Sequence, residues 1–240
     1  MLKPKVLITG ASSGLGLAMA KRLNQDYRLI LHASKDENIK ELRENNFVLA
    51  ADLSNAEELK DFCKRLKAEH GDELHAIINN AGISIDKPLT FQPEKDIDKM
   101  LMVNLKAPIM IAKTAMKIFG LKNSGVILQV SSCVAEQGNA FQSVYAATKA
   151  GLIAFSKSLA KEVAALQQGH QIRVLSISPG FIETPMTEAI PESERTKYLN
   201  LIPAQRFGRA DEIAETVAFL LSDKASYING STIDINGGLF

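Results

Sequence analysis

Short apolar segments recur along the chain, and each of them is too short to form a helix. Several are rich in Val and Ile, as strands that are buried on both faces of a sheet usually are. The sequence therefore predicts seven strands, at residues 6–8, 29–31, 48–50, 76–78, 126–130, 172–177 and 232–235.

The segments between these strands have helical periodicity, at residues 14–24, 55–69, 96–119, 143–168 and 211–221. Strands that alternate with helices require right-handed crossovers and predict a parallel sheet with helices on both faces. No repeat or linker-like stretch interrupts the pattern, so we expect one doubly wound α/β domain over residues 1–240.

Two serines are candidates for helix starts. Ser54 has Glu57 three residues later, and Ser34 has Glu37 at the same spacing. In a capping box of this kind, the serine and glutamate side chains bond free main-chain N–H groups. The sequence thus predicts a side-chain cap at each serine.

The composition is that of a globular protein. Of 240 residues, 46% are hydrophobic and 23% are charged, and 28 Lys and Arg balance 27 Asp and Glu to a net charge of +1. This balance gives no support to a nucleic-acid or anionic-membrane surface. No apolar run approaches the ~18–20 residues that span a bilayer, and the start of the chain lacks the apolar region of a signal peptide. We expect a cytoplasmic protein.

Cysteines and histidines are few. Two cysteines, Cys63 and Cys133, are too few for a disulfide framework, and we expect reduced structural thiols. The four histidines are scattered, and none has the spacing of a metal-ligand motif. No metal is expected.

A glycine-rich turn follows the first predicted strand and precedes a helix. The segment Thr9-Gly10-Ala11-Ser12-Ser13-Gly14-Leu15-Gly16 has the spacing G-x-x-x-G-x-G. Glycines at such a turn let the backbone approach a pyrophosphate, whose charge lies at the helix N-terminus. The alternative is a sharp strand-to-helix turn without a ligand.

Polar residues also follow the third and fourth predicted strands. Asp52-Leu53 comes after the third strand, and Asn79-Asn80-Ala81-Gly82 after the fourth. Open parallel sheets bind ligands at these carboxyl ends. Taken alone, each group is also consistent with ordinary turn chemistry.

Tyr145 and Lys149 are four residues apart in a predicted helix, which places them one turn apart on one face. The pKa of a free tyrosine is about 10, and a neighbouring ammonium favours the phenolate. Ser131 and Ser132 end the fifth predicted strand, where a hydroxyl could bond a substrate carbonyl. The Tyr–Lys spacing alone is weak, because it occurs by chance on many amphipathic helices.

Together, in this order, these motifs resemble the short-chain dehydrogenase/reductase family over essentially the whole chain. The matching residues are TGASSGLG at 9–16, NNAG at 79–82, Asn104, Ser132, Tyr145, Lys149, and Pro179-Gly180 with Thr184. The resemblance implies a Rossmann-type subunit with a seven-stranded sheet, a nicotinamide dinucleotide and reversible carbonyl reduction.

The resemblance also implies roles for individual residues. Tyr145 would donate the proton, Lys149 would lower its pKa and bond the nicotinamide ribose, Ser132 would polarise the carbonyl, and Asn104 would hold a water that relays protons to Lys149. The expected dinucleotide contacts are Gly10, Ser12, Ser13, Gly14, Leu15, Gly16, Ser34, Lys35, Asp52, Leu53, Asn80, Ala81, Gly82, Tyr145, Lys149, Pro179, Gly180, Ile182 and Thr184.

The second strand indicates which dinucleotide is bound. Family members that prefer NAD usually have a carboxylate at its end, but His32-Ala33-Ser34-Lys35 has none, and Lys35 could pair with a 2′-phosphate. NADP(H) is therefore favoured, and NAD(H) is not excluded. Many NADP(H) users also have a basic residue where this chain has Ser13.

Within the family, the chain is most similar to bacterial 3-oxoacyl-acyl-carrier-protein reductases. These use basic residues near the active-site entrance to dock the carrier protein. At the two corresponding places this chain has Asn123 and the stretch 166–168, and Lys122, Lys161 and His170 are the basic residues nearby that would compensate. The alternatives are another ketone, secondary alcohol or acyl-coenzyme A substrate, and, more distantly, a catalytically silent dinucleotide-binding regulator.

The resemblance also implies a homotetramer, formed by the long helices after the fourth and fifth strands. Residues 184–203 would be a substrate lid that orders on binding.

Overall fold

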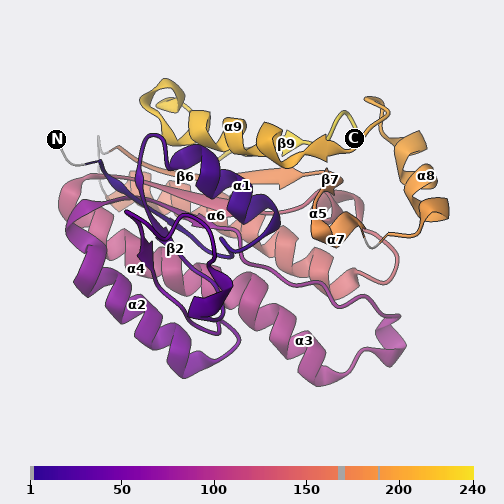
Figure 1. The fold of residues 1–240 in the computed structure, drawn as a ribbon, viewed down its shortest axis with the longest axis horizontal. Coiled ribbons are helices and arrows are strands. Elements are labelled where there is room, and N and C mark those ends of the chain that lie inside the picture. Colours follow the sequence, from indigo (N-terminus) through magenta and orange to yellow (C-terminus); the bar gives the residue numbers. More distant parts are fainter. Residues whose placement is uncertain (1–2, 167–170, 189) are drawn as a thin grey trace.

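A seven-stranded parallel sheet forms the centre of the subunit, in the order β3-β2-β1-β4-β5-β6-β9 (Figure 1). The structure, a computed structural model, describes residues 3–166, 171–188 and 190–240. The strands are β1 (Lys5–Ile8), β2 (Arg28–Leu31), β3 (Phe47–Val48), β4 (Leu74–Asn79), β5 (Ser124–Val130), β6 (Gln171–Pro179) and β9 (Thr232–Ile235). All seven predicted strands and the doubly wound parallel topology are confirmed.

Alternate residues of each strand point to opposite faces of the sheet. In β1, Val6 and Ile8 pack into one buried cluster while Leu7 packs into the other. Helices α1 (Gly14–Leu23) and α9 (Ala210–Leu221) cover the first face, and α2 (Ala56–His70), α4 (Ala107–Lys122) and α6 (Ser143–Leu166) cover the second (Figure 1). The predicted residues 167 and 168 of the fourth helix lie outside the described residues.

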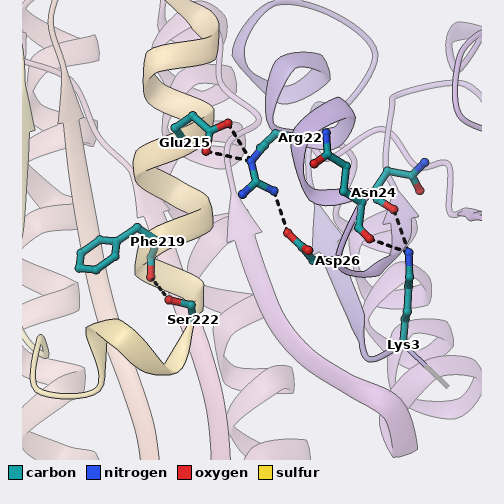
Figure 2. A network of polar contacts seen from close by, with 8 residues as sticks. Lys3, Arg22, Asn24, Asp26, Glu215, Phe219 and Ser222 are labelled. Carbon is teal, nitrogen blue, oxygen red and sulfur yellow. Dashed lines mark hydrogen bonds and ion pairs between the residues drawn. The ribbon is translucent and has the colours of Figure 1, made fainter. Parts of the chain in front are cut away.

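Helices α1 and α9 are also joined at the surface by Arg22 (Figure 2). Its Nε donates to both carboxylate oxygens of Glu215, at 2.8 and 2.9 Å, and its Nη1 donates to Asp26 at 2.7 Å. Nearby, Lys3 donates to the main-chain oxygen of Gln25 at 2.7 Å. Of these bonds, those between Arg22 and Glu215 link the first and last long helices of the chain, although exposed ion pairs of this kind contribute only modestly to stability.

The predicted helix at 96–119 consists of three pieces. Helix α3 (Glu94–Leu101) leads into the π-helical turn η4 (Met102–Lys106), and α4 follows without a break. At the end of η4 the amide of Ala107 donates to the oxygen of Met102, five residues earlier. A π turn holds one extra residue, and such turns are frequent at functional sites. This turn contains Asn104, whose side chain is completely buried.

Both predicted capping boxes are wrong. Helix α2 is capped by Asn55, whose Oδ1 accepts from the amides of Glu57 and Glu58, while the Ser54 hydroxyl donates to Asp52. Asn and Ser are about equally good caps, so the sequence did not distinguish the two neighbours. After Ser34 there is only a short 3₁₀ turn, η1 (Asp36–Asn38), without a side-chain cap.

The remaining elements are short and were not predicted. Beyond the carboxyl ends of the strands lie α5 (Val134–Gln137), α7 (Pro185–Glu188), α8 (Glu192–Leu201) and a small parallel pair, β7 (Ile182–Glu183) with β8 (Gly208–Arg209). The other 3₁₀ turns are η2 (Gly71–Glu73), η3 (Leu89–Phe91) and η5 (Asp223–Ala225). The described residues of the predicted lid segment thus contain two helices, α7 and α8.

None of the helices in the described part of the chain is long and apolar enough to cross a membrane.

Candidate active site

The glycine-rich turn lies where the strand order reverses. The chain runs outward from β1 through β2 to β3, then returns to β4 on the other side of β1. Ligands bind to open parallel sheets at this switch point. Gly10 has φ +67° there, and a Cβ on Gly16 would lie only 2.0 Å from the Gly10 oxygen. The turn therefore packs its own backbone at contact distance against the first residues of α1.

Thr9 and Asn80 hold this turn against the end of β4. The Thr9 hydroxyl accepts from the amides of Asn80 and Ala81, at 2.9 and 3.0 Å. In return, the Asn80 side chain donates to the main-chain oxygens of Thr9 and Gly10, at 2.9 and 3.2 Å. The two motifs that the sequence analysis singled out after β1 and β4 thus form one hydrogen-bonded unit.

One cavity of about 840 Å³ opens along the carboxyl ends of the strands. Most of the predicted site residues line it, namely Gly10, Ser12, Ser13, Gly14, Leu15, Ser34, Asp52, Leu53, Asn80, Ala81, Gly82, Ser132, Tyr145, Lys149, Pro179, Gly180, Ile182 and Thr184. The residues after β2 and β3 form one end, and those after β5 and β6 form the other, because the strand order separates them. Three predicted residues, Gly16, Lys35 and Asn104, do not line it.

Lys35 lies away from the cavity. Its side chain is 74% exposed, and its ammonium lies 3.9 Å from a carboxylate oxygen of Glu37. Ser34 does line the cavity, but its hydroxyl accepts from Asn38 at 3.3 Å. The nearest acidic residue after β2 on the chain, Asp36, bonds Arg43 at 2.7 Å.

Asn104 is positioned by the π turn and bonds the loop after β4. Its Oδ1 accepts from the amide of Ile83, and its Nδ2 donates to the oxygen of the same residue, both at 2.8 Å. A Cβ on Gly82 would lie 3.5 Å from that Oδ1 and 3.3 Å from Nζ of Lys149. Asn104 therefore holds the Gly82–Ile83 backbone close to the lysine.

Tyr145 and Lys149 lie on one face of α6, as their spacing predicts. Nζ of Lys149 is 5.7 Å from the centre of the Tyr145 ring and donates to the main-chain oxygen of Val130 at 2.8 Å. Burial lowers the pKa of Lys149 to about 8. Burial also raises the pKa of Tyr145 to about 12, against a hydrogen bond to the Ser132 side chain that acts in the opposite direction. Both side chains thus keep their protons at neutral pH, and the pKa of Tyr145 is shifted upward, opposite to the lowering by Lys149 that the family resemblance implies.

Two neighbours of this pair belong to the segment after β5. The Ser131 hydroxyl donates to the main-chain oxygen of Lys149 at 2.9 Å, which fixes α6 against the strand end. Cys133 also lines the cavity, and burial raises the pKa of its thiol, so it remains protonated.

Sequence reasoning missed several residues that line the cavity. His32 and Ala51 follow β2 and β3 at one end, and Asp86, Gln142 and Tyr198 lie at the other. Gln142 donates to Asp86 at 2.8 Å, and Tyr198 from α8 stacks on Phe181 with ring centres 4.2 Å apart. The position of His32 at a strand end was a usable signal. Nothing in the sequence pattern brought Gln142 and Asp86 together.

The cavity fits a nicotinamide dinucleotide. It is elongated across the switch point and has a glycine turn at which backbone can approach a diphosphate. Gly82 lacks a side chain where one would contact the Lys149 ammonium at 3.3 Å. Within the described ranges, no three His, Cys, Asp or Glu side chains gather as they would around a metal ion.

The sequence profile of the family described as "Enoyl-(Acyl carrier protein) reductase" matches residues 10–240. The 3-oxoacyl-[acyl-carrier-protein] reductase FabG of Escherichia coli is 38% identical over 239 residues, which cover 98% of this chain and 96% of that protein. The chain belongs to the short-chain dehydrogenase/reductase family. FabG of Thermotoga maritima is 37% identical over 243 residues, covering 97% and 96%.

Solved structures of this family share the fold. A protein proposed to be an NAD(P)-dependent gluconate 5-dehydrogenase from Beutenbergia cavernae, crystallised with NADP at low occupancy, is similar with a TM-score of 0.92 and 25% identity, covering 100% of this chain and 97% of that one. A short-chain dehydrogenase from Bacillus anthracis has a TM-score of 0.85 at 25% identity, covering 99% and 96%. As a short-chain dehydrogenase/reductase, this protein is an NAD(P)-dependent oxidoreductase.

Proposed function

We propose that the protein reduces the 3-keto group of a 3-oxoacyl thioester with NADPH, and that Tyr145 is the general acid. The observation that supports this most directly is the position of Tyr145, Lys149 and Ser132 on one wall of the cavity. The curated relatives named as 3-oxoacyl-[acyl-carrier-protein] reductases support the thioester as substrate.

The protonation state of Tyr145 suits an acid. Burial holds its pKa near 12, so the phenol keeps its proton until a stronger base forms beside it. The oxygen of a carbonyl that is being reduced becomes such a base. A bound nicotinamide dinucleotide supplies the hydride, and the side chains of the protein supply orientation and the proton.

Lys149 and Ser132 stabilise the charge that moves during this transfer. When Tyr145 gives up its proton, the phenolate lies near the Lys149 ammonium, which the Val130 oxygen holds in place. Ser132, whose side chain acts to lower the pKa of Tyr145, would orient and polarise the substrate carbonyl. Asn104, which does not line the cavity, would act indirectly by fixing the Gly82–Ile83 backbone. The water that Asn104 would hold stays a prediction.

The preference for NADPH is supported by the end of β2. The cavity-lining residues directly after β2 are His32, Ala33 and Ser34, and none of them has a carboxylate. The next acidic residue, Asp36, is bonded by Arg43. Ser34 would meet the 2′-phosphate. Lys35 lies off the cavity, so its assignment is the weakest of the predicted contacts. The test is kcat/KM with each dinucleotide, and an equal or higher value for NADH would overturn the preference.

Two of the positions considered for carrier-protein docking, Asn123 and Lys122, do not line the cavity of their own chain. Asn123 ends α4, and its oxygen accepts from Gln171 at the start of β6, at the amino edge of the sheet. Lys122 donates to main-chain oxygens of Asp72 and Leu74. Both positions precede strands, whereas the cavity of the same chain follows them, so carrier-protein docking by this region stays a prediction. Residues 167–170 lie outside the described residues.

The substrate test compares acetoacetyl groups on acyl carrier protein and on coenzyme A, with NADPH oxidation as the readout. A higher kcat/KM for the carrier form supports the first proposal. Equal values favour the second candidate, a reductase of free thioesters or other ketones. No turnover of either form with either dinucleotide would overturn the proposed reduction of 3-oxoacyl thioesters.

We further propose a homotetramer in the cytoplasm. The family resemblance supports the assembly, with α4 and α6 as contact helices. The two buried cysteines support a reducing compartment. Light scattering at micromolar concentration tests the assembly, and a monomeric mass would contradict it.

A further inference from the structure

His32 has no part in the chemistry described above, yet it is built into the nucleotide end of the cavity. It directly follows β2 and is only 3% exposed, and it lines the cavity between the glycine-rich turn and the segment after β3. A polar ring so deeply buried must have its hydrogen-bonding atoms satisfied.

The main chain of His32 already ties β2 to the glycine-rich turn. Its amide donates to the oxygen of Ile8 at 3.0 Å, and its oxygen accepts from the amide of Ala11 at 2.8 Å. These bonds continue the pairing of β1 with β2 to His32, one residue beyond β2, and to Ala11, three residues beyond β1. They leave the amide of Gly10, at the residue with φ +67°, to be satisfied by something else.

The ring of His32 satisfies it. The Gly10 amide donates to Nδ1 of His32 at 3.2 Å, and Nε2 lies 3.0 Å from the oxygen of Ala51. A main-chain amide can only donate and a carbonyl can only accept, so one tautomer fits both partners. Nδ1 is the bare acceptor, and Nε2 bears the hydrogen that is donated to Ala51.

The surroundings favour this neutral ring. The ring meets Phe62 of α2 edge to face, with centres 5.2 Å apart and planes at 80°. Burial lowers the pKa of His32 to about 4, and Asp52 is the charged side chain whose field opposes that change. In a protonated ring, Nδ1 would also bear a hydrogen, and this N–H would face the N–H of Gly10.

We propose that His32 is a positioning residue that fixes the glycine-rich turn and the Ala51–Leu53 segment at the spacing required by the adenosine diphosphate part of a dinucleotide. This rests on the proposed function, since a dinucleotide is taken as the ligand. The ring of His32 bonds the main chain of Gly10 and of Ala51, and both of these residues line the cavity. The residue acts on dinucleotide affinity and not on the transfer of hydride or proton, which takes place at the other end.

Three variants of His32 test the contributions of the two ring bonds, to Gly10 and to Ala51, separately. His32→Leu removes both. His32→Asn keeps an acceptor near the place of Nδ1 but loses the donor to Ala51. His32→Gln has an acceptor and a donor at the two ends of one planar group, as the neutral ring has. The measurements are the dissociation constant of NADPH, from its fluorescence, together with kcat and the thermal unfolding midpoint.

We expect His32→Leu to weaken NADPH binding about ten- to thirtyfold, as the loss of two hydrogen bonds implies, with kcat at saturation within about twofold. His32→Gln should restore most of the affinity, and His32→Asn should be intermediate. If His32→Leu fails to fold, the order of the Asn and Gln variants still decides, and equal affinity in these two and the natural protein overturns the proposal.

A matched control is His75→Leu. His75 is a partly buried histidine outside the cavity, whose Nε2 lies 3.3 Å from the Leu221 oxygen. This variant should lose stability without losing NADPH affinity. If His32→Leu behaves in the same way, the role of His32 is only structural and the proposal is wrong. If the natural protein binds neither NADPH nor NADH, the proposed function fails together with this inference, whereas normal binding in all variants overturns this inference alone.

Discussion

Lys149 directs its ammonium to the main-chain oxygen of Val130, 2.8 Å away, while that ammonium stays 5.7 Å from the centre of the Tyr145 ring. The lysine is thus held by a strand end and not by the tyrosine. A cation anchored in this way needs little reorganisation when a negative charge develops on the phenol, which is the condition for effective electrostatic stabilisation. Because Lys149 is held independently of Tyr145, variants of the two residues should affect the activity in different ways.

Replacing Tyr145 with Phe removes only the hydroxyl and keeps the ring. Without a general acid, we expect kcat to fall about 10²–10⁴-fold. The dissociation constant of NADPH should change little, because the phenyl ring preserves the shape of the cavity wall. Single-turnover absorbance and NADPH fluorescence measure the two effects. Turnover close to that of the natural protein would show that the acid lies elsewhere.

The activity should fall on the alkaline side with an apparent pKa near 8. Burial lowers the pKa of Lys149 to about 8, so its positive charge is present below that pH and is lost above it. Tyr145 keeps its proton over this range, because its pKa is near 12. The profile of kcat/KM from pH 6 to 10 checks this. Lys149→Met should show low activity with no inflection near 8, and an unchanged inflection would assign it to another group.

Asn104→Asp tests the bond from Asn104 to the loop after β4. The aspartate keeps an acceptor for the Ile83 amide but cannot donate to the Ile83 oxygen unless it is protonated. We expect the free energy of unfolding to decrease by about 1–3 kcal/mol and kcat to fall while KM for NADPH changes less. Thr148→Val leaves both Ile83 bonds in place and is the control; it removes the 3.3 Å contact from Asn104 and the bond from the Thr148 hydroxyl to the main-chain oxygen of Tyr145. Equal effects in the two variants would contradict a specific role of the Ile83 bonds.

Gly16→Ala should abolish dinucleotide binding. The new Cβ would lie 2.0 Å from the Gly10 oxygen, so the glycine-rich turn must move. Gly71→Ala is the control, because its Cβ would meet only Ile118, at 3.7 Å, in ordinary contact. Titration with NADPH and circular dichroism distinguish lost binding from lost folding. A Gly16→Ala protein with normal affinity would show that the close packing of this turn is not required.

The free energy of unfolding should fall as the pH is lowered from 6.5 toward 4. The pKa of His32 is about 4 in the folded protein against an ordinary 6.5, so the unfolded chain binds the proton more readily in this window. The shift corresponds to about 3 kcal/mol, fully lost only below pH 4. Urea denaturation at several pH values measures it, with His32→Gln as the comparison. The same slope in both proteins would mean that other groups cause it.

The sequence predicted the sheet well because buried strands need apolar residues and little else. It also predicted the convergence of Tyr145, Ser132 and the glycine-rich turn, since all of them follow strands or face the sheet. The π turn was missed because one extra residue barely changes the apolar periodicity of residues 96–119. The pair β7 and β8, with two residues each, is too short for any periodicity. The contacts of His32 depend on three strand ends meeting, which no local pattern reports.

The extra residue in the turn at Met102–Lys106 also restricts how this region can change in evolution. Exposed loops in general tolerate the gain or loss of residues. Deleting a single residue from the turn would restore ordinary α-helix with α3 and α4 still in place, but it would change the direction of the side chains within the turn. The loss would therefore affect the bonds of Asn104 to Ile83 and not the packing of α3 and α4, and a related sequence that needs a one-residue gap there should have abandoned Asn104.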